Sequence, residues 1–146
     1  MTFYLDTSLL VAALTAEADG ARVEAWLRLQ TARDLVVSDW VVTEFSAALS
    51  IKLRTGQLDA AQRTMALAEF SRFCDGGAAV LPVERRHFRT AALFSDQYAV
   101  GLRGGDALHL AVAFEYGAML CTLDRRLCEA GPDLGVQTFT VGGLFP

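Results

Sequence analysis

Short apolar segments alternate along this chain with longer segments whose apolar residues recur every three or four positions. The short segments have the length of buried strands, and the longer ones have the period of helices. Strands that alternate with helices predict an α/β fold, in which helices cover both faces of a central parallel sheet of four to five strands. The predicted strands cover residues 2–5, 35–38, 79–81, 119–122 and 136–139.

Helical periodicity and start signals place the helices between these strands. Thr7 or Ser8 is expected to cap the first helix, and Ser38 with Asp39 supplies the start of a long one. Gly104-Gly105 is expected to end a linker, and Gly131-Pro132 to close the last helix. The other predicted helices cover residues 19–30, 39–56, 58–74, 84–100, 106–116 and 124–130.

The length and composition fit one folded domain over residues 1–146, because 53% of the residues are hydrophobic and only 21% are charged. Two histidines and three cysteines without metal-type spacing argue against a zinc site. Asp6 interrupts the first apolar run, and no apolar run approaches the roughly 20 residues of a membrane span. We therefore expect a soluble, cytoplasmic protein with no membrane contact.

Four acidic residues lie where predicted strands end or where the following helices begin. The carboxyl ends of parallel strands form the usual ligand-binding edge of such a sheet, so these side chains are expected to lie close together. Each acid alone is more easily explained as a helix cap or a first-turn residue, but four at one edge favour a functional site. Glu44 is the most informative, because it interrupts an apolar helical stripe and needs a partner there. The four residues are Asp6, Glu44, Asp106 and Asp124.

Clustered carboxylates repel one another unless a cation neutralises them. A site with oxygen ligands alone favours Mg²⁺ or Mn²⁺ over zinc. Such an ion activates water and stabilises the charge that develops on a phosphodiester. The sequence therefore predicts metal-assisted phosphodiester hydrolysis.

Four motifs together resemble the PIN-domain family, and more narrowly its VapC-type toxins. The resemblance covers essentially the whole chain, and the Gly-Asp-Ala-Leu-His-Leu-Ala run and the Thr-x-Asp after a late strand are its more specific parts. The only departure noted is Gly105, where alanine is common. The motifs span residues 4–8, 38–44, 103–111 and 122–127.

The resemblance implies a three-layer α/β/α, Rossmann-like fold and a Mg²⁺- or Mn²⁺-dependent endoribonuclease. Such a protein acts as the toxin of a toxin–antitoxin pair and inhibits translation by cutting tRNA, rRNA or mRNA. It implies a homodimer and a cognate VapB-type antitoxin as partners. Asp6, Asp106 and Asp124 would hold the metal, while Glu44 completes the site or orients the attacking water. The supporting hydroxyl residues would be Thr7, Ser8 and Thr122.

Other polar residues near the motifs can be interpreted as functional or as structural. Arg103 and Arg125 flank the acids and are expected to bind RNA phosphates, whereas for Arg126 a solvated position at the helix is nearly as plausible. Thr122 suits an acid partner or a strand-end backbone bond equally well. His109 would be an unusual ligand in an oxygen site, so a histidine packed within its helix is favoured.

Net charge limits how such a protein could bind nucleic acid. Lys and Arg number 13 against 17 Asp and Glu, a net charge of −4, which excludes binding through bulk positive charge. Without the four site acids, 13 acids would balance the 13 bases. RNA binding should therefore depend on metal and on a few local arginines.

Other functions compatible with this pattern are a stand-alone PIN-domain RNA-processing nuclease and a non-catalytic module that binds RNA or a partner protein. A haloacid-dehalogenase-type phosphatase is disfavoured because Ser8 replaces the second acid of Asp-x-Asp. A phospho-accepting receiver domain is disfavoured because the only lysine, Lys52, is not late in the chain.

Overall fold

A five-stranded, fully parallel sheet forms the centre of the computed structural model, which describes residues 1–141. The predicted domain range therefore ends five residues beyond the described part. The strand order is β3-β2-β1-β4-β5. The strands are β1 (Phe3–Leu5), β2 (Leu35–Ser38), β3 (Ala79–Leu81), β4 (Met119–Thr122) and β5 (Thr138–Thr140).

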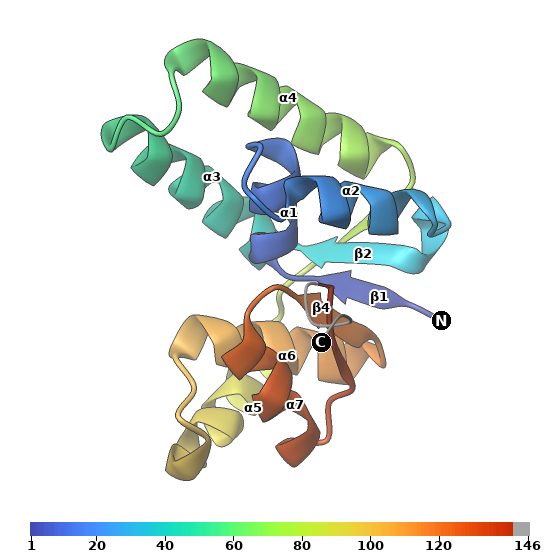
Figure 1. Cartoon of the computed structure of the whole chain (residues 1–146). Coiled ribbons are helices and arrows are strands. Elements are labelled where there is room, and N and C mark those ends of the chain that lie inside the picture. Colours follow the sequence, from blue (N-terminus) through green and yellow to red (C-terminus); the bar gives the residue numbers. More distant parts are fainter. Residues whose placement is uncertain (142–146) are drawn as a thin grey trace.

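Helices cover both faces of this sheet, as predicted (Figure 1). Helices α1 to α4 lie on one face, and α5 to α7 lie on the other. The result is the three-layer α/β/α arrangement. The helices are α1 (Thr7–Leu14), α2 (Gly20–Arg28), α3 (Asp39–Arg54), α4 (Ala60–Asp75), α5 (Arg85–Asp96), α6 (Gly104–Tyr116) and α7 (Arg125–Asp133), with short 3₁₀ turns η1 (Ala32–Asp34) and η2 (Tyr98–Val100).

The order of the strands explains why the functional edge lies next to β1. The chain first moves outward from β1 to β2 and β3, and then returns across the other face to β4 and β5. The direction of winding thus reverses between β1 and β4, which is the position where open α/β sheets bind ligands. In the register of the two strands, Leu5 lies opposite Cys121, so the residues that follow β1 and β4 emerge side by side.

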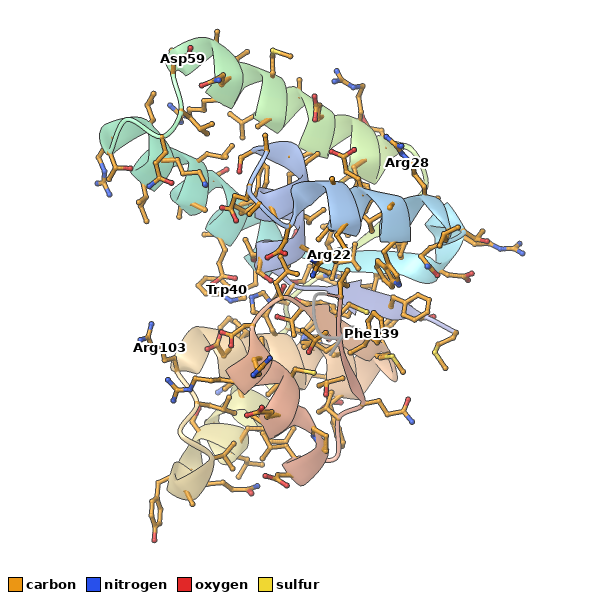
Figure 2. All side chains as sticks on the ribbon, in the orientation of Figure 1. Arg22, Arg28, Trp40, Asp59, Arg103 and Phe139 are labelled. Carbon is orange, nitrogen blue, oxygen red and sulfur yellow. The ribbon has the colours of Figure 1, made fainter. Side chains whose placement is uncertain are left out.

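Apolar side chains of the sheet and of the inward helix faces form one continuous core. Tyr4 and Leu5 of β1 and Phe45 and Leu49 of α3 are fully buried. On another part of the sheet, Trp26 stacks on Phe139 with ring centroids 5.7 Å apart. In the view of Figure 2, Phe139 appears to the right of Trp40 and Arg103. The sheet is therefore held by ordinary apolar packing.

Helix starts agree with the sequence prediction at one position and differ at two. Ser38 caps α3, because its hydroxyl accepts a hydrogen bond from the amide of Val41 at 3.3 Å. The cap of α1 is Asp6, not Thr7 or Ser8, because the Asp6 carboxylate accepts from the amide of Ser8. Gly104 and Gly105 form the first turn of α6 and do not end a linker.

Two predicted helix ends also differ from the structure. The helix predicted over residues 84–100 breaks at Gln97 and continues as η2, which ends at Gly101 in a left-handed conformation with φ of 72°. Helix α7 runs through Pro132 to Asp133, although proline lacks the amide that would bond the carbonyl of Cys128. The Thr138 hydroxyl donates to that carbonyl at 2.6 Å instead, so the proline leaves no acceptor unpaired.

The last strand, β5, begins two residues later than predicted. Among residues 1–141, no helix combines the length and the apolar character that crossing a membrane requires.

Candidate active site

Asp6 follows β1 directly, and its carboxyl group is buried. Its Oδ1 accepts from the Ser8 amide at 3.1 Å and from the Ser8 hydroxyl at 2.5 Å. Its Oδ2 accepts from the Thr122 hydroxyl at 2.6 Å. Burial raises the pKa of Asp6, although the charge of His109 and these hydrogen bonds act in the opposite direction. Asp6 is therefore rigidly held in a place where its negative charge is poorly compensated.

Thr122, the last residue of β4, connects Asp6 to Asp124. Its hydroxyl donates to Asp6 and accepts from the amide of Asp124 at 2.9 Å. Both roles considered for Thr122 from the sequence are thus fulfilled, an acid partner and a strand-end backbone bond. The Asp124 carboxylate caps α7 by accepting from the amides of Arg126 and Leu127, at 2.8 and 3.2 Å.

Glu44 lies on the second turn of α3, and its partners come from two other elements. Its Oε1 accepts from the Thr7 hydroxyl at 2.7 Å and is hydrogen-bonded to Nε2 of His109 on α6. Burial alone would raise the pKa of Glu44, but the hydrogen bond and charge of His109 outweigh it and lower this pKa. The expectation that Glu44 needs a partner within its apolar stripe is confirmed.

Asp106 lies in the first turn of α6 and is half-buried. Its pKa is raised, first by burial and then by the negative charges of Asp124 and Glu44, against the opposing effects of His109 and Arg103. Asp106 therefore lies within electrostatic range of Asp124, which follows β4, and of Glu44 on α3. This effect supports the predicted gathering for three of the four acids.

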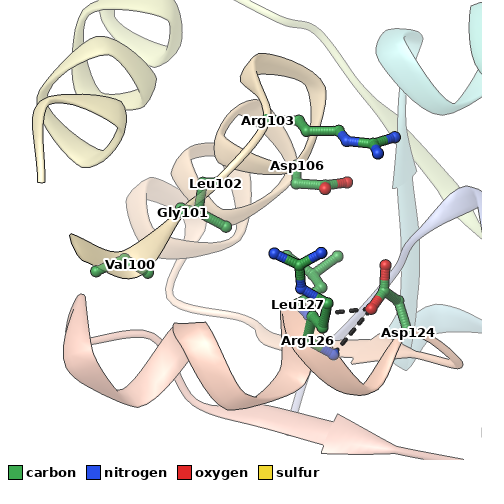
Figure 3. A pocket seen from close by; sticks show the side chains of 8 residues that line it. All are labelled: Val100, Gly101, Leu102, Arg103, Asp106, Asp124, Arg126 and Leu127. Atoms are coloured by element: carbon green, nitrogen blue, oxygen red, sulfur yellow. Dashed lines mark hydrogen bonds between the residues drawn. The ribbon is translucent and has the colours of Figure 1, made fainter. Parts of the chain in front are cut away.

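Asp106 and Asp124 line a cleft of about 160 Å³ between α6 and α7 (Figure 3). The rest of the cleft wall is formed by the segment from Val100 to Arg103, which leads into α6, and by Arg126 and Leu127 of α7. Arg103 and Arg126 line the cleft, whereas Arg125 does not. Asp6 and Glu44 do not line this cleft.

The four acids suit a divalent cation by chemistry, but they are not assembled as a finished metal site. Within residues 1–141, no three His, Cys, Asp or Glu side chains stand together as a metal-binding group. The candidate donors are carboxylates alone. Burial raises the pKa of both Asp6 and Asp106, and neighbouring acids add to the effect at Asp106. A hard cation bound by these oxygens would favour their charged forms.

Sequence reasoning missed two members of the site, His109 and Tyr4. His109 is buried in α6, as expected of a packed helix residue, but it also bonds Glu44 and the hydroxyl of Tyr4. A clue was present in the sequence, since a histidine within an apolar helical run needs polar partners. Which partners it has could not be deduced, because they lie 65 and 105 residues away in the chain.

The departure at Gly105 has a local steric reason. A Cβ atom at this position would lie 3.3 Å from the Trp40 ring and 3.5 Å from Oε2 of Glu44. The indole N–H of Trp40 also donates to the carbonyl of Gly105 at 3.3 Å. The glycine therefore lets α3 and α6 approach closely beside Glu44.

Replacing Asp6 with asparagine should make the stability of the metal-free protein less dependent on pH. Because the pKa of Asp6 is raised on folding, the metal-free native state loses stability as pH rises from the ordinary aspartate range through that raised pKa. The Asp6→Asn variant lacks this loss, so its melting temperature should fall less than that of the wild type as the pH rises. Thermal unfolding in chelator from pH 4 to 8 tests this. An equal fall in the two proteins, or a larger fall in the variant, would contradict it.

Comparison with known proteins places this geometry in a family. Residues 3–131 match the PIN domain. No curated protein sequence matches the chain significantly. Among solved structures, FitAcB from Neisseria gonorrhoeae aligns with a TM-score of 0.78 at 18% identity, over 98% of this chain and 100% of that chain.

Two further solved structures share the fold at similar identity. VapC20 of Mycobacterium tuberculosis, a sarcin-ricin loop cleaving toxin, has a TM-score of 0.72 at 17% identity, over 89% of this chain and 95% of that chain. The DNA-bound VapBC of Salmonella typhimurium has a TM-score of 0.73 at 16% identity, over 97% and 98%. The family match covers most of the sequence and these structures share its fold, and so the chain belongs to the PIN domain family.

Proposed function

We propose that this protein is a metal-dependent endoribonuclease that acts as the toxin of a toxin–antitoxin pair. The observation that carries the proposal is the cleft that Asp106 and Asp124 line together, with Glu44 near enough to raise the pKa of Asp106. Isolated helix caps would not need to share a cleft. Membership of the PIN domain family supports a nuclease, and the toxin role is supported by the toxins and complexes among its structural neighbours.

In this proposal Asp6, Asp106 and Asp124 hold Mg²⁺ or Mn²⁺, and each comes from a different element. The bound ion would activate water and neutralise charge that develops on the scissile phosphate. Ser8 and Thr122 fix both oxygens of the Asp6 carboxylate, and Thr7 fixes Glu44. Glu44, which remains ionised because its pKa is lowered, would complete the metal site or orient the attacking water.

The proposed partners are a VapB-type antitoxin, an RNA substrate and a second copy of this chain. The structural neighbours include FitAB bound to DNA and VapBC complexes bound to DNA, which supports a proteinaceous antitoxin partner. The substrate is tRNA, rRNA or mRNA. A cytoplasmic location follows from this role.

Purified protein incubated with total RNA and Mg²⁺ or Mn²⁺ tests the proposal. We expect endonucleolytic products that vanish in EDTA and return when the ion is restored. Cleavage that persists in EDTA would contradict metal dependence. Absence of cleavage with either ion, by protein shown to be folded, would favour the non-catalytic binding module. Growth arrest on expression, relieved by the gene product encoded beside it, would separate a toxin from a stand-alone nuclease.

Arg126 should contribute more to RNA binding than its neighbour Arg125. Arg126 lines the cleft with Asp106 and Asp124, whereas Arg125 does not. We expect Arg126→Ala to raise KM about 3- to 10-fold and to reduce the salt dependence of RNA binding by about one phosphate contact. Arg125→Ala is the matched control on the same turn. Equal effects of the two variants would show that the cleft wall does not define the RNA path.

A further inference from the structure

A chain of buried side-chain hydrogen bonds extends from β2 across β1 to Glu44. The hydroxyls of Ser38 and Tyr4 lie 2.7 Å apart, and the Tyr4 hydroxyl lies 2.9 Å from Nδ1 of His109. Nε2 of His109 then bonds Oε1 of Glu44. Ser38, Tyr4 and His109 are at most 2% exposed, whereas the Glu44 side chain is 30% exposed. These hydrogen bonds thus connect the interior of the sheet to the partly accessible carboxylate of Glu44.

When the imidazole carries the charge that lowers the pKa of Glu44, both ring nitrogens donate; when it is neutral, the protons of this hydrogen-bond network have one consistent arrangement. The Glu44 carboxylate can only accept, so Nε2 of His109 carries a proton and donates it. Nδ1 then accepts from the Tyr4 hydroxyl, whose oxygen accepts from the Ser38 hydroxyl. The Ser38 oxygen in turn accepts from the amide of Val41. In the neutral ring, a Tyr4 hydroxyl that donates to Nδ1 therefore favours the same His109 tautomer that Glu44 requires.

The two oxygens of Glu44 have different surroundings. Oε1 accepts from both Thr7 and His109. Oε2 accepts no hydrogen bond from any residue of the described chain, and it lies near Gly105, where a Cβ atom would be 3.5 Å away. One oxygen thus anchors the carboxylate, while the other is left with its lone pairs available to a ligand.

His87 provides a comparison within the same molecule. It is also buried, but its Nδ1 accepts from the amide of Glu84 in the capping box of its own helix. Such a local bond is what a histidine needs merely to be satisfied in the core. His109 instead joins side chains from two other elements, with one ring nitrogen to each. This arrangement constrains Glu44 as well as satisfying His109.

We propose that His109 is a positioning residue that fixes the Glu44 carboxylate for catalysis, and that the buried Tyr4 hydroxyl sets the tautomer with which it does so. This inference rests on the proposed nuclease function and assigns two residues to it. It predicts that His109 acts on turnover only through Glu44. A role confined to core packing would change stability and leave the turnover of folded protein unchanged.

Steady-state RNA cleavage tests the role of His109. His109→Leu should lower kcat about 10- to 100-fold, as loss of a residue that orients a site side chain generally does, with KM changed less than about 2-fold. His109→Gln retains an N–H donor and should recover at least part of kcat. Tyr4→Phe should lower kcat by a smaller factor. Unchanged kcat in His109→Leu, or equal kcat in the Leu and Gln variants, would overturn the proposal.

A double-mutant cycle shows whether the effect passes through Glu44. Once Glu44→Gln is present, adding His109→Leu should lower kcat little further. Multiplicative losses would overturn the proposal, because His109 would then act independently of Glu44.

Nitrogen NMR of the His109 ring provides a readout that does not require activity. In wild-type protein the neutral ring should be protonated at Nε2, and Tyr4→Phe should reduce this preference. A ring protonated at Nδ1 would overturn the positioning proposal even if RNA is cleaved. Conversely, if the protein shows the expected tautomer and still cleaves no RNA, the proposed nuclease function would be wrong, while the hydrogen-bond geometry described here would stand.

Discussion

Replacing Asp106 with asparagine is expected to lower the rate of RNA cleavage on the order of 10²–10³-fold, which is the size expected for losing a preorganised electrostatic group. The change keeps the shape of the side chain and removes the negative charge that interacts with those of Asp124 and Glu44. It should also weaken the binding of Mg²⁺ or Mn²⁺, since a carboxylate is a stronger ligand for hard cations than an amide oxygen. The fold should persist, because Asp106 is only half-buried and caps no helix.

Single-turnover cleavage with excess protein measures this effect without interference from product release. Metal binding is measured separately by titration calorimetry. Asp96→Asn is the matched control, because it makes the same change to an exposed residue at the end of α5. If Asp106→Asn cleaves RNA at the rate of Asp96→Asn, Asp106 does not belong to the catalytic machinery.

The fold was largely predictable because its signals are local. Each strand is a short apolar run, and Ser38 is a recognisable cap. The strand order was not predictable, because nothing within β3 or β5 shows that they occupy opposite edges of the sheet. The boundaries that differed from prediction depend on distant contacts. An example is Pro132, which α7 tolerates because Thr138 satisfies the carbonyl left unbonded.

The candidate site, like the fold, has features that the sequence predicts and features that depend on contacts between distant residues. The acids could be selected because position after a strand or at a helix start can be read directly from the sequence. The hydroxyls of Thr7 and Thr122 could be named only from the family resemblance, and the structure shows that they bond Glu44 and Asp6. His109 and Tyr4 could not be joined to Glu44 in advance, since their contacts depend on how β1, α3 and α6 pack together.

Removal of divalent metal is expected to weaken RNA binding at least tenfold, a cost of about 1.4 kcal/mol. The net charge of −4 equals the charge of the four site acids, because the other 13 acids are balanced by 13 basic residues. Without a cation, Asp106 and Asp124 would face the phosphates of the RNA within the same cleft that Arg103 and Arg126 line. A pair of unit charges 4 Å apart contributes about 1 kcal/mol even in bulk water, so a few such repulsions account for the expected loss.

Fluorescence anisotropy with a non-cleavable 2′-O-methyl RNA measures this binding in Mg²⁺ and in EDTA at equal ionic strength. The variant that combines Asp106→Asn with Asp124→Asn separates repulsion from a general salt effect. With the carboxylates of the cleft neutralised, RNA binding in EDTA should exceed that of the wild type, and the response to Mg²⁺ should be smaller. If the wild type binds RNA equally well with and without metal, the arginines of the cleft wall hold the RNA by themselves, and the acids do not govern its approach.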